Sequence, residues 1–241
     1  MSSEDLTRDM KRTVGIEAAR MVGPGDVVGL GTGSTAEFMI EELGRRVREE
    51  QLDIVGIPTS FDASVLAREN GIPPGTLDDV DRVDIAVDGA DEVDPAMNLI
   101  KGRGAAHLRE KIVDGMAERF VVIVDESKLV ERLGTKCPVP LEVLPMAVRP
   151  VMRAVEAMDG EPVLRMAVHK DGPVITDQGN MVVDARFDGI DEPGEMERAL
   201  NNIPGILENG LFVGLATEVL VGRITGDCRI EVERRTRAHD A

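Results

Sequence analysis

The chain has 241 residues but no tryptophan or tyrosine, and only five phenylalanines. We therefore do not expect recognition by aromatic stacking on bases or sugar faces. No apolar run approaches the roughly 18 residues that a membrane-spanning helix needs, and the first residues lack a basic and then apolar signal pattern. These absences predict a cytoplasmic protein.

Positive charge is also scarce. The chain has 45 acidic and 28 basic residues, a net charge of −17, and only six of the basic residues are lysine. Such a surface repels nucleic acid and anionic membranes, so we expect neither as a partner. Strong acidity with few lysines resembles proteins of a high-salt cytoplasm, where salt screens self-repulsion. An ordinary acidic cytosolic protein is the alternative.

Cysteine is limited to Cys137 and Cys228. The two residues are far apart in the sequence and fit no metal-ligand spacing. We expect reduced structural thiols and no metal site.

Short apolar runs alternate with amphipathic segments over the first half of the chain. Strands are predicted at 27–30, 54–57, 83–87 and 120–124, and helices at 5–22, 35–49, 61–70 and 105–118. This order predicts an α/β fold with a doubly wound, mostly parallel sheet of the Rossmann-like class.

The rhythm changes after about residue 131, where four prolines follow within 20 residues. Helices are then predicted at 148–158 and 194–201, and strands at 163–168 and 181–184. A run at 211–213 is expected to return to the first domain as a strand. We therefore expect a catalytic α/β domain of residues 1–130 and 207–241. Residues 131–206 are expected to form a small α+β domain with a role in subunit contact.

Three predicted strands run into chemically unusual loops. These are residues 31–35 (GTGST), 88–92 (DGADE) and 125–128 (DESK). The carboxyl ends of parallel strands meet at one edge of a sheet, where open α/β folds bind ligands. Glycines, hydroxyls, paired carboxylates and an ammonium group at that edge suit a phosphorylated, hydroxyl-rich substrate such as a sugar phosphate.

Residues 31–36 fit the G-x-G-x-x-A fingerprint of dinucleotide-binding folds. That fingerprint also needs an acid at the end of the next strand, but residues 57–60 are IPTS and Asp53 precedes the strand. A phosphate cradle built from backbone N–H groups and the Ser34 and Thr35 hydroxyls is the better interpretation. A tight turn capped by serine or threonine is the structural alternative.

Asp88 and Asp91 place two carboxylates on one turn. Their spacing does not match an EF-hand loop, although a Mg²⁺ site and solvated loop acids are alternatives. Gly89 and Ala90 lie between the aspartates instead of further charges, which indicates close approach to a ligand. Such a pair can bind sugar hydroxyls and transfer protons during ring opening.

Residues 101–104 (KGRG) precede a predicted helix that carries Glu110. Glycines beside Lys101 let backbone and ammonium approach an anion. Taken alone, Glu110 is best interpreted as a surface glutamate. For Lys128, a surface-loop lysine and a ligand contact are equally good interpretations.

Together these loops resemble the A-type ribose 5-phosphate isomerases. The matching motifs follow one another in this order: 11–15 (KRTVG), 31–36 (GTGSTA), 87–92 (VDGADE), 101–106 (KGRGAA), 109–112 (REKI), 125–128 (DESK), 176–180 (TDQGN), 203–206 (IPGI) and 210–212 (GLF). Each is weak alone, but several independent motifs in the same order are specific.

The resemblance implies an aldose–ketose isomerase of the non-oxidative pentose phosphate pathway. It would interconvert D-ribose 5-phosphate and D-ribulose 5-phosphate. Glu110 would move a proton between C1 and C2 through a cis-enediol(ate). Asp88 and Asp91 would bind the sugar and assist ring opening, and Lys101 would stabilise charge on the enediolate oxygen.

The resemblance also implies the other properties of the site. The substrate-binding residues would be Thr32, Gly33, Ser34, Thr35, Asp88, Gly89, Ala90, Asp91, Lys101, Gly102, Arg103, Gly104 and Lys128, with Lys11 a weaker candidate. No metal or organic cofactor is expected, and the assembly would be a homodimer or homotetramer. Arg103 replaces the usual third glycine of its loop and is tolerated if its side chain points outward.

Two other functions occur on related folds. A coenzyme A transferase would use a glutamate as a covalent acyl carrier. A sugar-phosphate sensor would need a DNA-binding module, which this sequence does not display, and would not need the aspartate pair or the glutamate. We therefore prefer the isomerase.

Overall fold

The computed structural model describes residues 3–237, which divide into two compact units. The first unit comprises residues 3–89, 109–128 and 215–237, and the second comprises 90–108 and 129–214. The predicted division therefore needs a correction, because residues 90–108 and 207–214 belong to the second unit. Their strands pair with one another, so the run at 211–213 does not return to the first unit.

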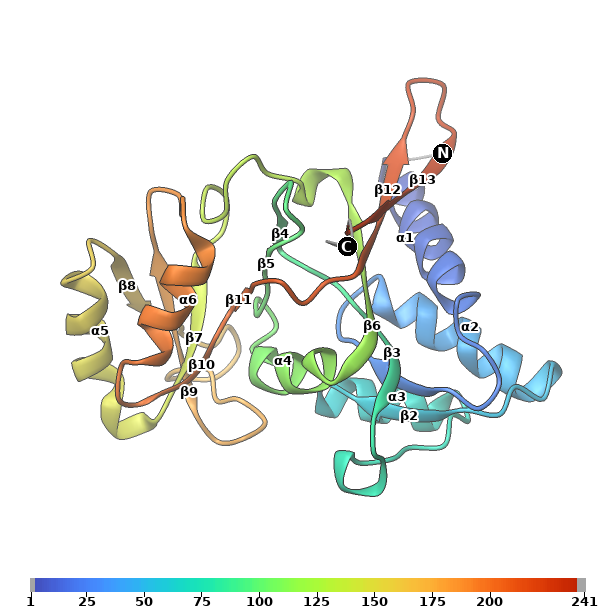
Figure 1. The fold of residues 1–241 in the computed structure, drawn as a ribbon, viewed down its shortest axis with the longest axis horizontal. Helices are drawn as coiled ribbons and strands as arrows, with labels where there is room; N and C mark the ends of the chain where they lie inside the picture. Colours follow the sequence, from blue (N-terminus) through green and yellow to red (C-terminus); the bar gives the residue numbers. More distant parts are fainter. Residues whose placement is uncertain (1–2, 238–241) are drawn as a thin grey trace. The chain divides into compact units, whose positions relative to one another are not determined.

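A six-stranded sheet forms the centre of the first unit (Figure 1). Its strands, in spatial order, are β13 (Ile230–Thr236), β12 (Glu218–Ile224), β6 (Ala117–Asp125), β3 (Val83–Asp88), β1 (Val27–Leu30) and β2 (Val55–Pro58). Every neighbouring pair is parallel except β12 and β13. The Rossmann-like α/β class is thus confirmed.

The helices of the first unit connect and cover these strands. They are α1 (Ser3–Ala19), α2 (Ala36–Glu49), α3 (Phe61–Glu69), α4 (His107–Gly115, which begins in the second unit) and the short 3-10 helices η1 (Leu77–Asp79) and η2 (Glu126–Lys128). On α2 the apolar residues Met39, Ile40 and Leu43 are buried in the core. Helix α1 packs so closely on α2 at Gly15 that a Cβ atom there would lie only 2.9 Å from the Met39 nitrogen.

The hairpin of β12 and β13 was not predicted. Strand β13 is an edge strand with the sequence IEVERRT, in which charged residues interrupt the apolar ones. A sequence of this kind gives a weak strand signal, because only one side of an edge strand must be apolar.

The second unit contains two antiparallel sheets. The four-stranded sheet has the spatial order β10 (Ile206–Asn209), β7 (Val139–Val143), β9 (Met181–Arg186) and β8 (Glu161–Leu164). The three-stranded sheet has the order β11 (Leu211–Phe212), β5 (Leu99–Ile100) and β4 (Glu92–Val93). The helices are α5 (Val148–Glu156), α6 (Pro193–Asn201) and the short 3-10 helix η3 (Pro145–Ala147).

Strand β7 organises the core of the second unit although it contains Pro140. Alternate residues Val139, Leu141 and Val143 join the cluster that includes Val155 of α5 and Leu200 of α6, as expected for one face of a strand. No strand was predicted here, because prolines disfavour strands and surround this segment.

Glu142 of the same strand explains the motif at 176–180. Its carboxylate oxygen Oε1 accepts hydrogen bonds from Thr176 Oγ1 at 2.8 Å and Asn180 Nδ2 at 2.9 Å, and the residue is fully buried. The motif therefore fastens a turn to the sheet.

Within residues 3–237, no helix is long and apolar enough to cross a membrane. The same residues contain no group of three or more His, Cys, Asp or Glu side chains that could hold a metal ion. Neither Cys137 nor Cys228 forms a disulfide, and Cys228 is exposed in the turn between β12 and β13.

Candidate active site

Residues 31–35, called the glycine loop below, follow β1 and lead into α2. The Gly31 N–H donates to the Val87 carbonyl oxygen at 3.0 Å, and a Cβ atom at Gly31 would lie 2.4 Å from both that oxygen and Asp88 Oδ1. Only glycine fits there. Gly33 has a φ of +114°, a conformation that side chains disfavour.

Asp88 holds this loop against the end of β3. Its Oδ1 atom accepts hydrogen bonds from the Thr32 N–H at 3.0 Å and from the Gly89 N–H at 2.7 Å. Asp88 is fully buried. The solvated-acid interpretation is therefore wrong for this residue.

Three hydroxyl groups join the glycine loop to the end of β2. Thr32 Oγ1 donates to Ser60 Oγ at 2.7 Å and lies 2.9 Å from Thr59 Oγ1. Thr59 in turn donates to the Leu30 carbonyl oxygen, and Ser60 Oγ caps α3 by accepting from the Ala63 N–H. The loops after β1, β2 and β3 thus meet at one sheet edge. For the loops after β1 and β3 this meeting was predicted.

The start of α2 has the features of an anion site. Thr35 occupies the N-cap position but makes no side-chain capping hydrogen bond. The simple capped-turn alternative is therefore not observed. Lys11 Nζ, from α1, donates to Ser34 Oγ at 2.9 Å and brings positive charge to the helix N-terminus.

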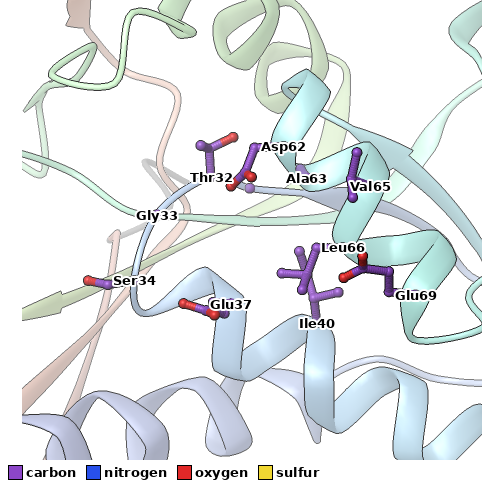
Figure 2. Close-up of a pocket in the computed structure, with 11 residues that line it drawn as sticks. Thr32, Gly33, Ser34, Glu37, Ile40, Asp62, Ala63, Val65, Leu66 and Glu69 are labelled. Atoms are coloured by element: carbon purple, nitrogen blue, oxygen red, sulfur yellow. The ribbon is translucent and has the colours of Figure 1, made fainter. Parts of the chain in front are cut away.

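Two cavities adjoin the glycine loop. One, of about 370 Å³, lies between α2 and α3 and is lined by the loop, an apolar floor with Ile40 and Leu66, and the carboxylates of Glu37, Asp62 and Glu69 (Figure 2). Its lining contains no lysine or arginine, so it disfavours a phosphate.

The other cavity, of about 390 Å³, suits an anion better. Its lining contains Ser34 together with Arg8 and Lys11, although Glu4 and Glu37 also border it. The cavity beside Lys11 and Ser34 is therefore the better candidate for a phosphate site.

Glu110 lies on α4 and is only 5% exposed, so the surface-glutamate interpretation is wrong. The neighbouring Arg109 donates from its guanidinium to the Pro58 carbonyl oxygen at 3.1 Å, at the end of β2. Val113, one turn later, packs on Gly29 of β1. These contacts fix the helix that carries Glu110 to the first unit.

Lys128 ends η2, just after β6, and is half-buried. The preceding turn is fixed because Asp125 Oδ1 accepts a hydrogen bond from the Ser127 N–H at 2.9 Å. Strand β6 is the neighbour of β3, so Lys128 follows a strand end at the same edge as Asp88.

The remaining predicted residues belong to the second unit. Lys101 follows β5, is only 2% exposed, and its Nζ atom lies 5.4 Å from the centre of the Phe212 ring. This distance is typical of a cation–π contact. The Lys101 N–H donates to the Gly210 carbonyl oxygen at 2.9 Å, so the three-stranded sheet positions the lysine.

Residues 101–104, called the lysine loop below, follow a path that requires glycine at position 102. Gly102 has a φ of +109°, and a Cβ atom there would lie 2.8 Å from the His107 ring. The Arg103 N–H donates to Asp91 Oδ2 at 3.0 Å, while the Arg103 side chain is exposed as its tolerance requires. Asp91 N–H donates to the Ile100 carbonyl oxygen, which ties the aspartate to the same hairpin.

Comparison with known proteins decides the family. Residues 55–226 match the family model described as ribose 5-phosphate isomerase A (phosphoriboisomerase A). The chain belongs to the ribose 5-phosphate isomerase A family.

Individual relatives agree with this assignment. Ribose-5-phosphate isomerase A of Thermosynechococcus vestitus is 63% identical over 92% of this chain and 94% of its own length. The solved structure of ribose 5-phosphate isomerase A from Methanocaldococcus jannaschii has a TM-score of 0.89, with 51% identity over 98% of this chain and 100% of its own. Another solved D-ribose-5-phosphate isomerase, in complex with phospho-erythronic acid, has a TM-score of 0.91 and 47% identity over the same shares.

For a member of this family, the structure adds residues that the sequence analysis did not select. Thr59 and Ser60 were noted only because they are not acidic, yet they hold Thr32. The sequence feature that could have identified them is a pair of hydroxyl side chains directly after a predicted parallel strand. Lys11, expected to be a weaker candidate, contacts the glycine loop directly.

Proposed function

We propose that the chain interconverts D-ribose 5-phosphate and D-ribulose 5-phosphate with Glu110 as the base. Family membership makes the chain an isomerase of ribose 5-phosphate. The observation that supports Glu110 is its burial on α4. Arg109 ties this helix to the carboxyl end of β2, and Val113 packs it on β1. Burial raises the basicity of a carboxylate, which a base that removes a proton next to a carbonyl needs.

The reaction begins with ring opening, for which we propose Asp88 and Asp91 as the groups that bind and exchange protons with the sugar hydroxyls. Glu110 then removes the C2 proton of the open aldose. The electron pair of that C–H bond forms the C1=C2 double bond, and negative charge moves to O1. Glu110 returns the proton to C1 while the O2 proton passes to O1, which leaves a hydroxyl at C1 and the ketone at C2.

Charge on the enediolate oxygen must be stabilised in advance by fixed donors. We propose the Lys101 ammonium and the lysine-loop amides for this role. Gly89, Ala90, Gly102, Arg103 and Gly104 complete the proposed sugar contacts through their backbone. The reaction as written needs no metal or organic cofactor.

The phosphate anchors the substrate away from the reacting carbons and so orients it. We propose the glycine loop from Thr32 to Thr35, the N-terminus of α2 and Lys11 as the phosphate site, with Lys128 as a further substrate contact. Support comes from the Lys11–Ser34 hydrogen bond and the basic cavity beside it.

We also propose a homodimer or homotetramer in the cytoplasm, without nucleic acid or membrane partners. The edge strand β8 and the loop after it expose apolar side chains: Val163 (63%), Met166 (58%) and Val168 (89%). Exposed edge strands with apolar side chains favour association. Sedimentation of the purified protein would test the assembly.

The first experiment is the conversion of ribose 5-phosphate to ribulose 5-phosphate by purified protein, with a chelator present, at low and molar KCl. We expect activity in the chelator, and a higher rate in molar KCl if the acidic surface reflects high-salt adaptation. Folded protein without activity at either salt concentration would contradict the function. Turnover of thioesters would then indicate a transferase.

The matched variant is Glu110→Gln, which keeps size and polarity but cannot accept a proton. We expect folding and substrate binding close to those of the unchanged protein, and turnover lower by several orders of magnitude. Near-normal turnover would remove Glu110 from the mechanism.

A further inference from the structure

The lysine loop is held by a side chain more than 60 positions later in the sequence. Arg165 Nη1 donates to the carbonyl oxygens of Gly102 at 2.9 Å and Arg103 at 3.0 Å. All three residues belong to the second unit. None of the motifs found in the sequence includes Arg165.

Arg165 is itself fixed. It directly follows β8, its N–H donates to the Val182 carbonyl oxygen, and its own carbonyl oxygen accepts from the Val174 N–H, both at 2.9 Å. Its Nε atom donates to Asp184 Oδ2 at 2.8 Å, and Nη2 donates to Asp184 Oδ1. This two-point ion pair is largely shielded, with side-chain exposures of 17% and 20%.

The two carbonyl contacts orient two peptide groups. In a trans peptide the C=O and N–H bonds point in opposite directions. With both carbonyl groups directed at Arg165, the N–H groups of Arg103 and Gly104 face away from it. The Arg103 N–H accordingly donates to Asp91 Oδ2 on that side, at 3.0 Å.

We propose that Arg165, oriented by Asp184, is a positioning residue of the isomerase: it holds the lysine loop so that the Arg103 N–H orients Asp91 and the Gly104 N–H faces the substrate. This inference rests on the proposed function, because it assigns Asp91 to the sugar and the Gly104 amide to the enediolate. A planar guanidinium suits the role, since it can bind a carboxylate at two points and still donate to two carbonyl groups. Residues 131–206, expected to serve subunit contact, thereby acquire a part in the reaction as well.

The test compares Arg165→Ala with Arg186→Ala in the full chain. Arg186 is an exposed arginine of β9, two residues after Asp184. Its substitution by alanine removes the same charge as Arg165→Ala but leaves the contacts of Arg165 with the lysine loop in place. We expect Arg165→Ala to lower kcat by about 10²-fold, because a shift of about 1 Å in an active-site group can cost that much. KM should change less than about threefold. Arg186→Ala should keep both constants within about twofold.

Three further measurements separate positioning from general destabilisation. Added guanidinium ion at millimolar concentration should restore part of the kcat of Arg165→Ala and leave Arg186→Ala unchanged. Arg165→Lys should recover less than guanidinium does, because an ammonium cannot form the two-point pair and both carbonyl contacts together. Affinity for phospho-erythronic acid, which a relative binds, should fall in Arg165→Ala more than affinity for inorganic phosphate.

If Arg165→Ala fails to fold, Asp184→Asn and Arg165→Lys can be compared with Arg186→Ala instead. We expect smaller losses of kcat in these two variants. Normal kcat in a folded Arg165 variant would overturn the inference while leaving the isomerase function intact. The inference would also be overturned if guanidinium did not restore kcat and the loss of kcat matched the loss of thermal stability. An inactive unchanged protein would instead contradict the proposed function itself.

Discussion

The glycine loop and the lysine loop are both short, glycine-containing segments proposed to bind one substrate, but they are held in different ways. In the glycine loop, backbone N–H groups donate to acceptors from the neighbouring strand of the same parallel sheet, Val87 and Asp88. In the lysine loop, two carbonyl groups accept from Arg165, which follows β8 in another sheet.

The two kinds of support differ in how far they depend on local sequence. The supports of the glycine loop lie at the carboxyl ends of β2 and β3, so the rule that ligands bind at the carboxyl ends of parallel strands already places them beside the loop. The lysine loop depends on a distant arginine whose location follows no such rule. We therefore expect the glycine loop to be sensitive to its own residues and the lysine loop to its remote support.

The largest effect in this comparison is expected from Gly31→Ala. The new Cβ atom would lie 2.4 Å from the Val87 carbonyl oxygen and from Asp88 Oδ1, so the backbone of β3 or the buried Asp88 carboxylate would have to shift. Overpacking of this kind costs about 1–3 kcal/mol of unfolding free energy or more. Thermal denaturation should show the loss, and turnover should fall with it. A variant as stable and active as the unchanged protein would contradict the role given to Asp88.

A smaller effect is expected from Gly33→Ala, which sharpens the first prediction. A Cβ atom at Gly33 meets no atom within 4 Å, so only its φ of +114° opposes the substitution. Backbone strain in such a region costs about 1–3 kcal/mol. We expect a loss of stability below that of Gly31→Ala, measured in the same denaturation series, and a raised KM. The reverse order of stability would show that steric contact does not dominate in this loop.

The smallest effect is expected from Arg103→Gly, which restores the usual third glycine of the lysine loop. The side chain is exposed, and the contacts of the residue with Asp91 and Arg165 use only its backbone. Glycine should cost about 0.5–1 kcal/mol through backbone entropy. Steady-state kinetics should give kcat and KM within about twofold of the unchanged protein. A larger loss of kcat would place the Arg103 side chain in the reaction.

Much of the fold was predictable because buried parallel strands are continuous apolar runs that alternate with amphipathic helices. The helix 36–49 and the strands 83–88 and 117–125 agree with the predictions to within a few residues. The errors lie where burial is one-sided or the chain pairs antiparallel: β7 with its proline, and β13 with its charged residues. The domain division failed because β11 pairs with β5, which lies more than 100 positions earlier.

The α/β class, the glycine loop and the residue types proposed for the chemistry could be predicted from the sequence, because strand periodicity and motif spacing are local properties. The burial of Glu110 and Asp88, the support of Thr32 by Thr59 and Ser60, and the contact of Arg165 with the lysine loop are visible only in the folded chain. Burial and long-range hydrogen bonds depend on which segments the fold brings together. A residue type alone does not carry that information.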